Sequence, residues 1–363
     1  MLKTKLEPWQ RKKLFFWIAL LLIFATVYLG ATSFSLYADK KAEDDYWNYY
    51  LNEADSYTAD ETAIMEDATQ VTVGTYVETM NAMDMKNSKF TVTFRCWFSW
   101  EGREDFDPSQ SFEIYNGTAN KVEILRSENL GTQHYQLLRV NATVSKSFWT
   151  VRFPVGSYQF RFYLKPTDTI ENLVFVPDTA HSGINDSLNL SGFKVARNAT
   201  GLCIIREDPE MFQAPFDQDN CSSYSEVMTA FELNRDSWGL YLKCIIALIG
   251  TNAWVLISLF VCTYHKVDSL AMIPAILFGT VSNILVGANL IPDAMYAGLL
   301  EYVNIWGIYI ILISSLIIVN INRIRNEHQD EAFAKLFGRC MFTIILATTV
   351  LGYLLLPCSA YRF

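Results

Sequence analysis

The stretch DSLAMIPAILFGTVSNILVGANLIP, residues 268–292, carries no charge after its first residue and is long enough to cross a bilayer as a helix. Its acid, its amide and several small or aromatic residues recur at steps of three and four, which places them on one helical face. The residues of this stripe are Asp268, Ala271, Ala275, Phe278, Ser282, Leu285 and Asn289. Such a stripe is costly against lipid and favourable against a water-filled axis, but small residues also let membrane helices pack closely. The pattern alone leaves both interpretations open.

Uncharged segments of this length recur in the chain of 363 residues, 51% of which are hydrophobic. We therefore expect an integral membrane protein with spans at residues 14–38, 244–264, 269–292, 302–322 and 340–361. The first span follows a basic cluster and could also be a signal peptide. Because its uncharged run is long for that role, we interpret it as a retained anchor.

The charges separate by region. Residues 39–236 are acidic on balance, whereas the segment before the first span and the loops after the second and fourth spans carry lysines and arginines. Basic flanks mark the cytoplasmic side of a membrane protein. We therefore expect the N-terminus to be cytoplasmic and residues 39–236 to lie outside the plasma or inner membrane.

Residues 39–70 are acidic and show no clear periodicity, which favours a linker with at most a short helix. From residue 71 the pattern changes to period two. In KFTVTFRCWFSW, residues 89–100, alternate positions form an apolar face that includes a buried thiol at Cys96. Further short strands are expected near residues 110–116, 121–126, 134–144, 148–153, 158–165, 172–176, 188–196, 201–206 and 223–233.

Many short strands with one buried face predict an antiparallel β-sandwich. The expected organisation is a tail and first span at 1–38, the linker at 39–70, the sandwich at 71–236 and a four-helix transmembrane domain at 237–363. Cys203 and Cys221 bracket a loop of the sandwich, so a disulfide between them is plausible outside the cell.

Catalytic patterns are missing from the sequence. It contains no HExxH, no phosphate-binding glycine loop and no GxSxG, and the interiors of the expected spans hold no acid or base that a proton-coupled transporter would use. We therefore expect no enzyme, no cofactor or metal site, and no nucleic-acid partner.

Over residues 71–361 the order of parts resembles the pentameric ligand-gated ion channels, the Cys-loop receptor superfamily, and especially its prokaryotic members. In the sandwich region the resemblance lies in a strand that ends in Trp100 and Glu101, in a second strand that ends in Asn116, and in a central loop motif with Phe153, Pro154 and Gln159. Nearer the membrane it lies in Arg235 before the second span and in NLIPDA, which contains Pro292. The two cysteines of the family's loop are absent, Val155 and Gly156 replace Phe-Asp, and the first span is additional. The chain is thus expected to be a divergent member.

The resemblance implies a homopentamer in lipid whose pore is lined by the stripe described above and passes cations. A ring of Asp268 carboxylates would attract them, unless Lys266 pairs with Asp268. Phe278 is the candidate gate, and its alternative role is packing or lipid contact. A different class also fits the residues: a non-conducting membrane receptor or scaffold with a β-sandwich ectodomain.

The resemblance also implies a site for a small-molecule or cation ligand between neighbouring sandwiches. Aromatic residues beside carboxylates suit an amine or a metal cation, although a solvated acidic loop is the simpler interpretation. The implied ligand residues are Trp100, Glu207, Asp208, Phe212 and Phe216. The implied coupling residues are Phe153, Pro154, Arg235 and Pro292, together with the loop 293–301.

Overall fold

The computed structural model describes residues 6–52, 57–188, 190–207, 222–236, 238–273, 279–280, 284 and 297–361. The chain divides into two compact units, and each is described by itself. The helical unit comprises residues 1–42, 150–156 and 237–363, and the sandwich unit comprises residues 43–149 and 157–236.

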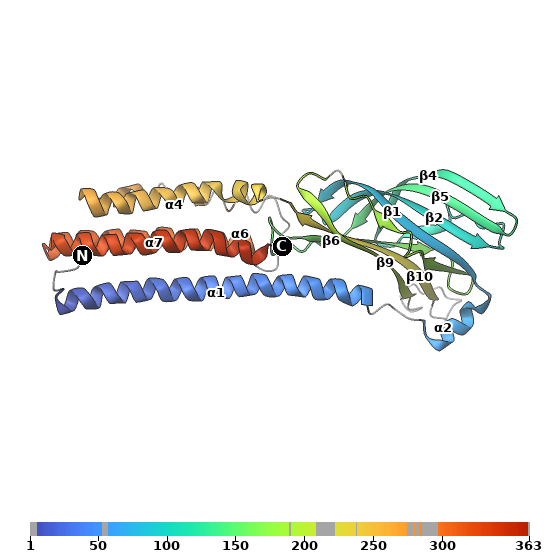
Figure 1. Cartoon of the computed structure of the whole chain (residues 1–363), viewed down its shortest axis with the longest axis horizontal. Helices are drawn as coiled ribbons and strands as arrows, with labels where there is room; N and C mark the ends of the chain where they lie inside the picture. The colour runs from blue at the N-terminus through green and yellow to red at the C-terminus, as the bar shows by residue number, and fades with distance from the viewer. Residues whose placement is uncertain are drawn as a thin grey trace, which may run out of the picture. The chain divides into compact units, whose positions relative to one another are not determined.

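The sandwich unit contains two β-sheets (Figure 1). The first has the strand order β4 (Gly117–Leu130), β5 (Gln133–Ser145), β2 (Lys89–Glu101), β1 (Thr69–Asp84) and β7 (Leu173–Pro177), and β8 (Gly183–Ile184) also pairs with β1. The second has the order β3 (Phe112–Ile114), β6 (Tyr158–Pro166), β10 (Ser222–Arg235) and β9 (Phe193–Glu207). The predicted sandwich-like domain is confirmed, but β7 and β8 pair with β1 in parallel, so the first sheet is mixed.

Aromatic side chains fill the space between the two sheets. The predicted apolar face of β2 is buried along its whole length: Phe90, Val92, Phe94, Cys96, Phe98 and Trp100. Across the core the rings of Phe94 and Phe162 stack with centroids 4.4 Å apart, and those of Phe90 and Phe160 meet edge to face at 5.1 Å. Burial raises the pKa of the Cys96 thiol, as expected for a thiol among apolar side chains.

The other face of the second sheet is covered by helical residues that the sequence did not predict. Helix α1 (Pro8–Asn52) continues well past the expected span, and α2 (Ala59–Ile64) follows it. Much of the range 39–70, expected to be a linker, is therefore helical. Within the sandwich unit Trp47 of α1 packs against Met228 and Ala230 of β10.

The helical unit contains α4 (Gly239–His265), α6 (Leu299–Glu327), α7 (Glu331–Ala360) and residues 8–42 of α1 (Figure 1). A 3-10 turn, η2 (Leu270–Met272), follows α4. Among the described residues four helices, not five, are long and apolar enough to cross a membrane. The expected span at 269–292 is not among them, because most of it lies outside the described residues. The others identify the chain as an integral membrane protein.

Helix α1 contacts α6 and the start of α7 through polar and aromatic side chains. The hydroxyl of Tyr28 donates to the backbone oxygen of Tyr302 at 2.8 Å, and the Phe24 ring stacks on that of Tyr309 with centroids 3.9 Å apart. Near the other end Gln10 donates to the carboxylate of Asp330, the residue that caps α7. In a membrane such contacts replace the hydrophobic driving force that lipid removes.

Glycines allow α4, α6 and α7 to approach closely. A Cβ added at Gly307 of α6 would lie 2.6 Å from Leu248 of α4, and one at Gly338 of α7 would lie 2.6 Å from Thr263 of α4. A Cβ at Gly352 of α7 would overlap the indole of Trp306, which is fully buried on α6. The helix crossings therefore depend on residues that have no side chain.

We predict that Gly352→Ala destabilises the helical unit because the rigid Trp306 indole cannot yield to a new methyl group. Overpacking of this kind costs about 1–3 kcal/mol. Gly250→Ala is the matched control, since a Cβ there would meet nothing within 4 Å. Thermal unfolding of the purified full chain in detergent should show a lower midpoint for Gly352→Ala only. Equal midpoints for both variants would contradict the packing described.

Candidate functional site

The turn at residues 150–156 follows β5 and precedes β6 in the chain, yet its contacts assign it to the helical unit. It was expected to be partly a strand at 148–153, but its backbone folds on itself instead. The amide of Phe153 donates to the oxygen of Thr150 at 2.9 Å, and the amide of Val155 donates to that of Arg152 at 3.0 Å. The peptide bond between Phe153 and Pro154 is cis.

This turn supplies a hydrogen-bond acceptor to the first residue of α6. The amide of Leu299 donates to the backbone oxygen of Val151 at 2.7 Å, and the amide of Gly298 donates to the carboxylate of Glu301 at 2.9 Å. The first amides of a helix have no partner inside the helix, so both bonds satisfy groups that would otherwise be unpaired. A Cβ at Gly298 would collide with the Val151 carbonyl, so only glycine allows this approach.

Arg152 joins the same turn to two further helices. Its side chain is 2% exposed, and its Nε lies 3.2 Å from a carboxylate oxygen of Asp39 on α1. Its Nη1 donates to the backbone oxygen of Ala360 at 3.4 Å. That oxygen lies at the end of α7, where the helix dipole favours a cation. The sequence analysis did not single out Arg152, and its only signal is its place beside the Phe153–Pro154 motif.

The structure places two of the four coupling residues in this turn. Phe153 and Pro154 are both buried in the helical unit. Arg235 belongs to the sandwich unit, where its guanidinium lies 4.0 Å from the centroid of the Phe193 ring. Pro292 lies outside the described residues.

At the start of the segment 268–292, Asp268 is exposed and its carboxylate accepts hydrogen bonds from the backbone amide of Leu270 and the side-chain amide of Asn322. The nearby cation, Lys266, lies 2.5 Å from the carboxylate of Glu331. Lys266 therefore does not neutralise Asp268 in this structure. Ala271 is also exposed. The remaining stripe residues, Ala275, Phe278, Ser282, Leu285 and Asn289, lie outside the described residues.

The predicted ligand residues are only partly described. Trp100 is buried, donates its Nε1 hydrogen to the oxygen of Arg103 at 3.1 Å and stacks on His134. Glu207, at the end of β9, accepts a hydrogen bond from Lys165 at 2.6 Å. Asp208, Phe212 and Phe216 lie outside the described residues, as does Cys221, so the Cys203–Cys221 disulfide stays a prediction.

Acidic residues of α1 and α2 pair with arginines on the second sheet. Arg206 of β9 donates two hydrogen bonds to the carboxylate of Glu61, at 2.8 and 3.0 Å. This pairing holds the pKa of Glu61 at about 2. Arg197 of β9 likewise contacts Asp44 of α1 at 2.8 Å. Acidic residues that could have served only to keep the linker soluble thus form ion pairs between helical residues and the second sheet.

One buried carboxyl group on the second sheet forms no such pairing with the described residues. Glu226 of β10 is 2% exposed, and its Oε1 has no hydrogen-bond partner among the described residues. Burial raises the pKa of Glu226 to about 8, although the positive charge of Lys165 opposes the shift.

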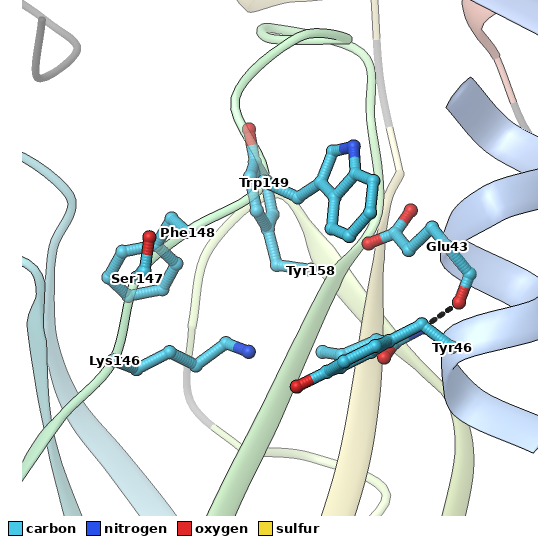
Figure 2. Close-up of a pocket in the computed structure, with 8 residues that line it drawn as sticks. Glu43, Tyr46, Lys146, Ser147, Phe148, Trp149 and Tyr158 are labelled. Carbon is cyan, nitrogen blue, oxygen red and sulfur yellow. Dashed lines mark hydrogen bonds between the residues drawn. The ribbon is translucent and has the colours of Figure 1, made fainter. Parts of the chain in front are cut away.

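Residues of this unit also surround a pocket of about 230 Å³, lined by Glu43, Tyr46, Lys146, Ser147, Phe148, Trp149, Tyr158 and Gln159. Figure 2 shows the Lys146 nitrogen directed toward the space between Tyr158 and Tyr46. Burial, followed by the positive charge of Arg161, lowers the pKa of Lys146 to about 8. Sequence analysis did not identify this pocket, because its wall includes helical residues from the expected linker.

We predict that Arg152→Met is strongly destabilising, because it removes the buried cation that pairs with the Asp39 carboxylate. Breaking one side of a buried ion pair costs about 3–5 kcal/mol. The control is Arg95→Met, which removes an ion pair to Glu78 from a side chain that is 49% exposed, where pairs contribute about 1 kcal/mol or less. Thermal unfolding in detergent compares the two. A smaller loss for Arg152→Met than for Arg95→Met would refute the role given to the turn.

Glu226 should make stability depend on pH. Because its folded pKa of about 8 lies above its unfolded value, the folded protein binds more protons between these values. The free energy of unfolding should therefore fall as the pH rises from about 4.5 to about 8, by at most roughly 1.4 kcal/mol per pH unit.

Unfolding midpoints measured from pH 5 to 8 test this expectation. Glu226→Gln should remove the part of the slope that Glu226 contributes, and the exposed-carboxyl control Glu171→Gln should retain it. The expectation fails if the unfolding midpoints of wild type and Glu226→Gln depend on pH in the same way.

No model of a protein family matches this chain, and no curated protein matches its sequence. What the chain's own residues establish is a membrane protein with a β-sandwich domain followed by long apolar helices.

Proposed function

We propose that this chain is the subunit of a homopentameric ligand-gated channel that conducts cations. In this proposal residues 268–292 of each copy line the pore, the N-terminus is cytoplasmic, and the sandwich unit lies outside the plasma or inner membrane. The order of elements supports it: a two-sheet sandwich precedes three long apolar helices, and the segment 268–292, uncharged after Asp268, falls between the first two of them.

The observation that carries the proposal is the state of Asp268. Its carboxylate is exposed, and the cation two residues away pairs with Glu331 instead. In a closed ring of subunits these carboxylates would surround the inner mouth, concentrate cations and repel anions. A carboxylate at this place that forms no ion pair with the described residues serves conduction better than it serves packing against lipid.

Gating in this proposal passes through the turn at 150–156. A small molecule or cation that binds the sandwich changes the position of the turn, and the turn holds the first amide of α6 through Val151. The residues just before α6 connect it to the segment 268–292. A shift of the turn therefore biases the pore-lining segment, with Arg152 keeping the turn attached to α1 and α7.

The first test is the molecular mass of the full chain in detergent, measured by light scattering, and we expect the mass of a pentamer. Because the agonist is not identified, conduction is measured in liposomes with Phe278→Ser, which removes the proposed apolar gate. This variant should leak K⁺ without ligand. The matched control is Ile284→Ser, which introduces the same residue off the stripe and should remain closed.

Selectivity is tested in the leaking variant. Adding Asp268→Asn should lower the preference for K⁺ over Cl⁻ several-fold. Adding Glu327→Gln should not, because that carboxylate is exposed and paired with Arg323. A monomer or dimer without flux would reject the channel and favour a non-conducting receptor or scaffold.

A further inference from the structure

The pocket in the sandwich unit has one side formed by the connection after β5 and another formed by residues of α1 and β6. All of its lining residues belong to the same unit of one chain. A ligand there would therefore bind within a single subunit. The pocket does not depend on the proposed conduction, and its occupancy can be tested separately.

One wall of this pocket carries a cation. The ammonium group of Lys146 makes no hydrogen bond or ion pair with the part of the chain that the structure describes. Arg161 adds a second positive charge nearby, while it lies over the Tyr46 ring with its carbon 4.6 Å from the ring centroid. A partly buried ammonium beside another cation is stabilised by an anion.

The remaining walls are largely aromatic. Phe148 and Tyr158 meet edge to face with centroids 6.3 Å apart, and Tyr46 and Trp149 lie 6.3 Å apart at a tilt. Figure 2 shows these rings around the Lys146 nitrogen. Flat or branched apolar groups fit between such rings, whereas a hydrated inorganic anion would lose water without gaining contacts.

A single carboxylate limits the charge of the ligand. Glu43 is 2% exposed and accepts a hydrogen bond from the hydroxyl of Ser157 at 3.2 Å. Figure 2 shows its carboxylate on the Trp149 side of the pocket, away from Lys146. This negative charge disfavours ligands with more than one anionic group, such as phosphates.

We propose that this pocket binds a small monocarboxylate with an aromatic or branched apolar body. The carboxylate of the ligand pairs with the Lys146 ammonium, and its body lies between the rings of Phe148, Trp149 and Tyr158. The volume of about 230 Å³ limits the ligand to a molecule smaller than most drugs.

Calorimetry on the full chain in detergent tests this with phenylacetate as the probe. Wild type should bind it, and Lys146→Met should weaken binding by roughly tenfold or more, the loss expected for one charge-assisted hydrogen bond. The matched control is Lys121→Met, which replaces an exposed lysine of β4 that pairs with Glu123 and should leave binding unchanged.

Two further arms make the result decisive. Trp149→Ala removes an apolar wall from a partly exposed position and should also weaken binding, which keeps the proposal testable if Lys146→Met does not fold. Phenethylamine, with a similar body and the opposite charge, should bind more weakly than phenylacetate. Tighter binding of phenethylamine, no binding of phenylacetate at millimolar concentration, or an unaffected Lys146→Met variant would each overturn the proposal.

Discussion

A guanidinium removed from water is the constraint on which the helical unit depends. Arg152 is almost completely buried, so its charge must remain paired. Its partners lie on α1 and at the end of α7, while its neighbour Val151 accepts the first amide of α6. One short turn therefore satisfies polar groups on three helices. A turn bonded in this way cannot shift without changing the ends of those helices, which makes it a suitable place for coupling.

Elements whose apolar residues recur at a fixed period could be predicted from the sequence. The alternation in β2 and the long uncharged runs that became α4, α6 and α7 follow from one physical rule, the burial of apolar surface at a fixed period. The segment at 148–153 was wrongly predicted to be a strand, because its mixture of aromatic and β-branched residues resembles one. Its backbone instead forms the turn that carries Arg152.

Buried polar residues explain most of what could not be predicted. Along α1 the buried positions from residue 21 to residue 47 are separated by three, four or seven residues, which keeps them on one helical face, and two of them are polar: Leu21, Ala25, Leu29, Thr32, Leu36, Glu43 and Trp47. A hydrophobic pattern does not detect Glu43, so the helix was expected to end too early. Two acids of the expected linker, Asp44 and Glu61, likewise pair with arginines of β9, and no local pattern reveals contacts between residues so distant in sequence.

Water access along residues 268–292 tests the proposed channel most directly. Single cysteines are introduced at stripe positions, with Ser282→Cys and Leu285→Cys as the main sites and Ile284→Cys as the neighbour off the stripe. Their reaction with a charged thiol reagent is followed in liposomes, against the background of the native cysteines. The proposal predicts reaction at the stripe positions and protection at the neighbour. Protection of all three positions would contradict a water-filled pore.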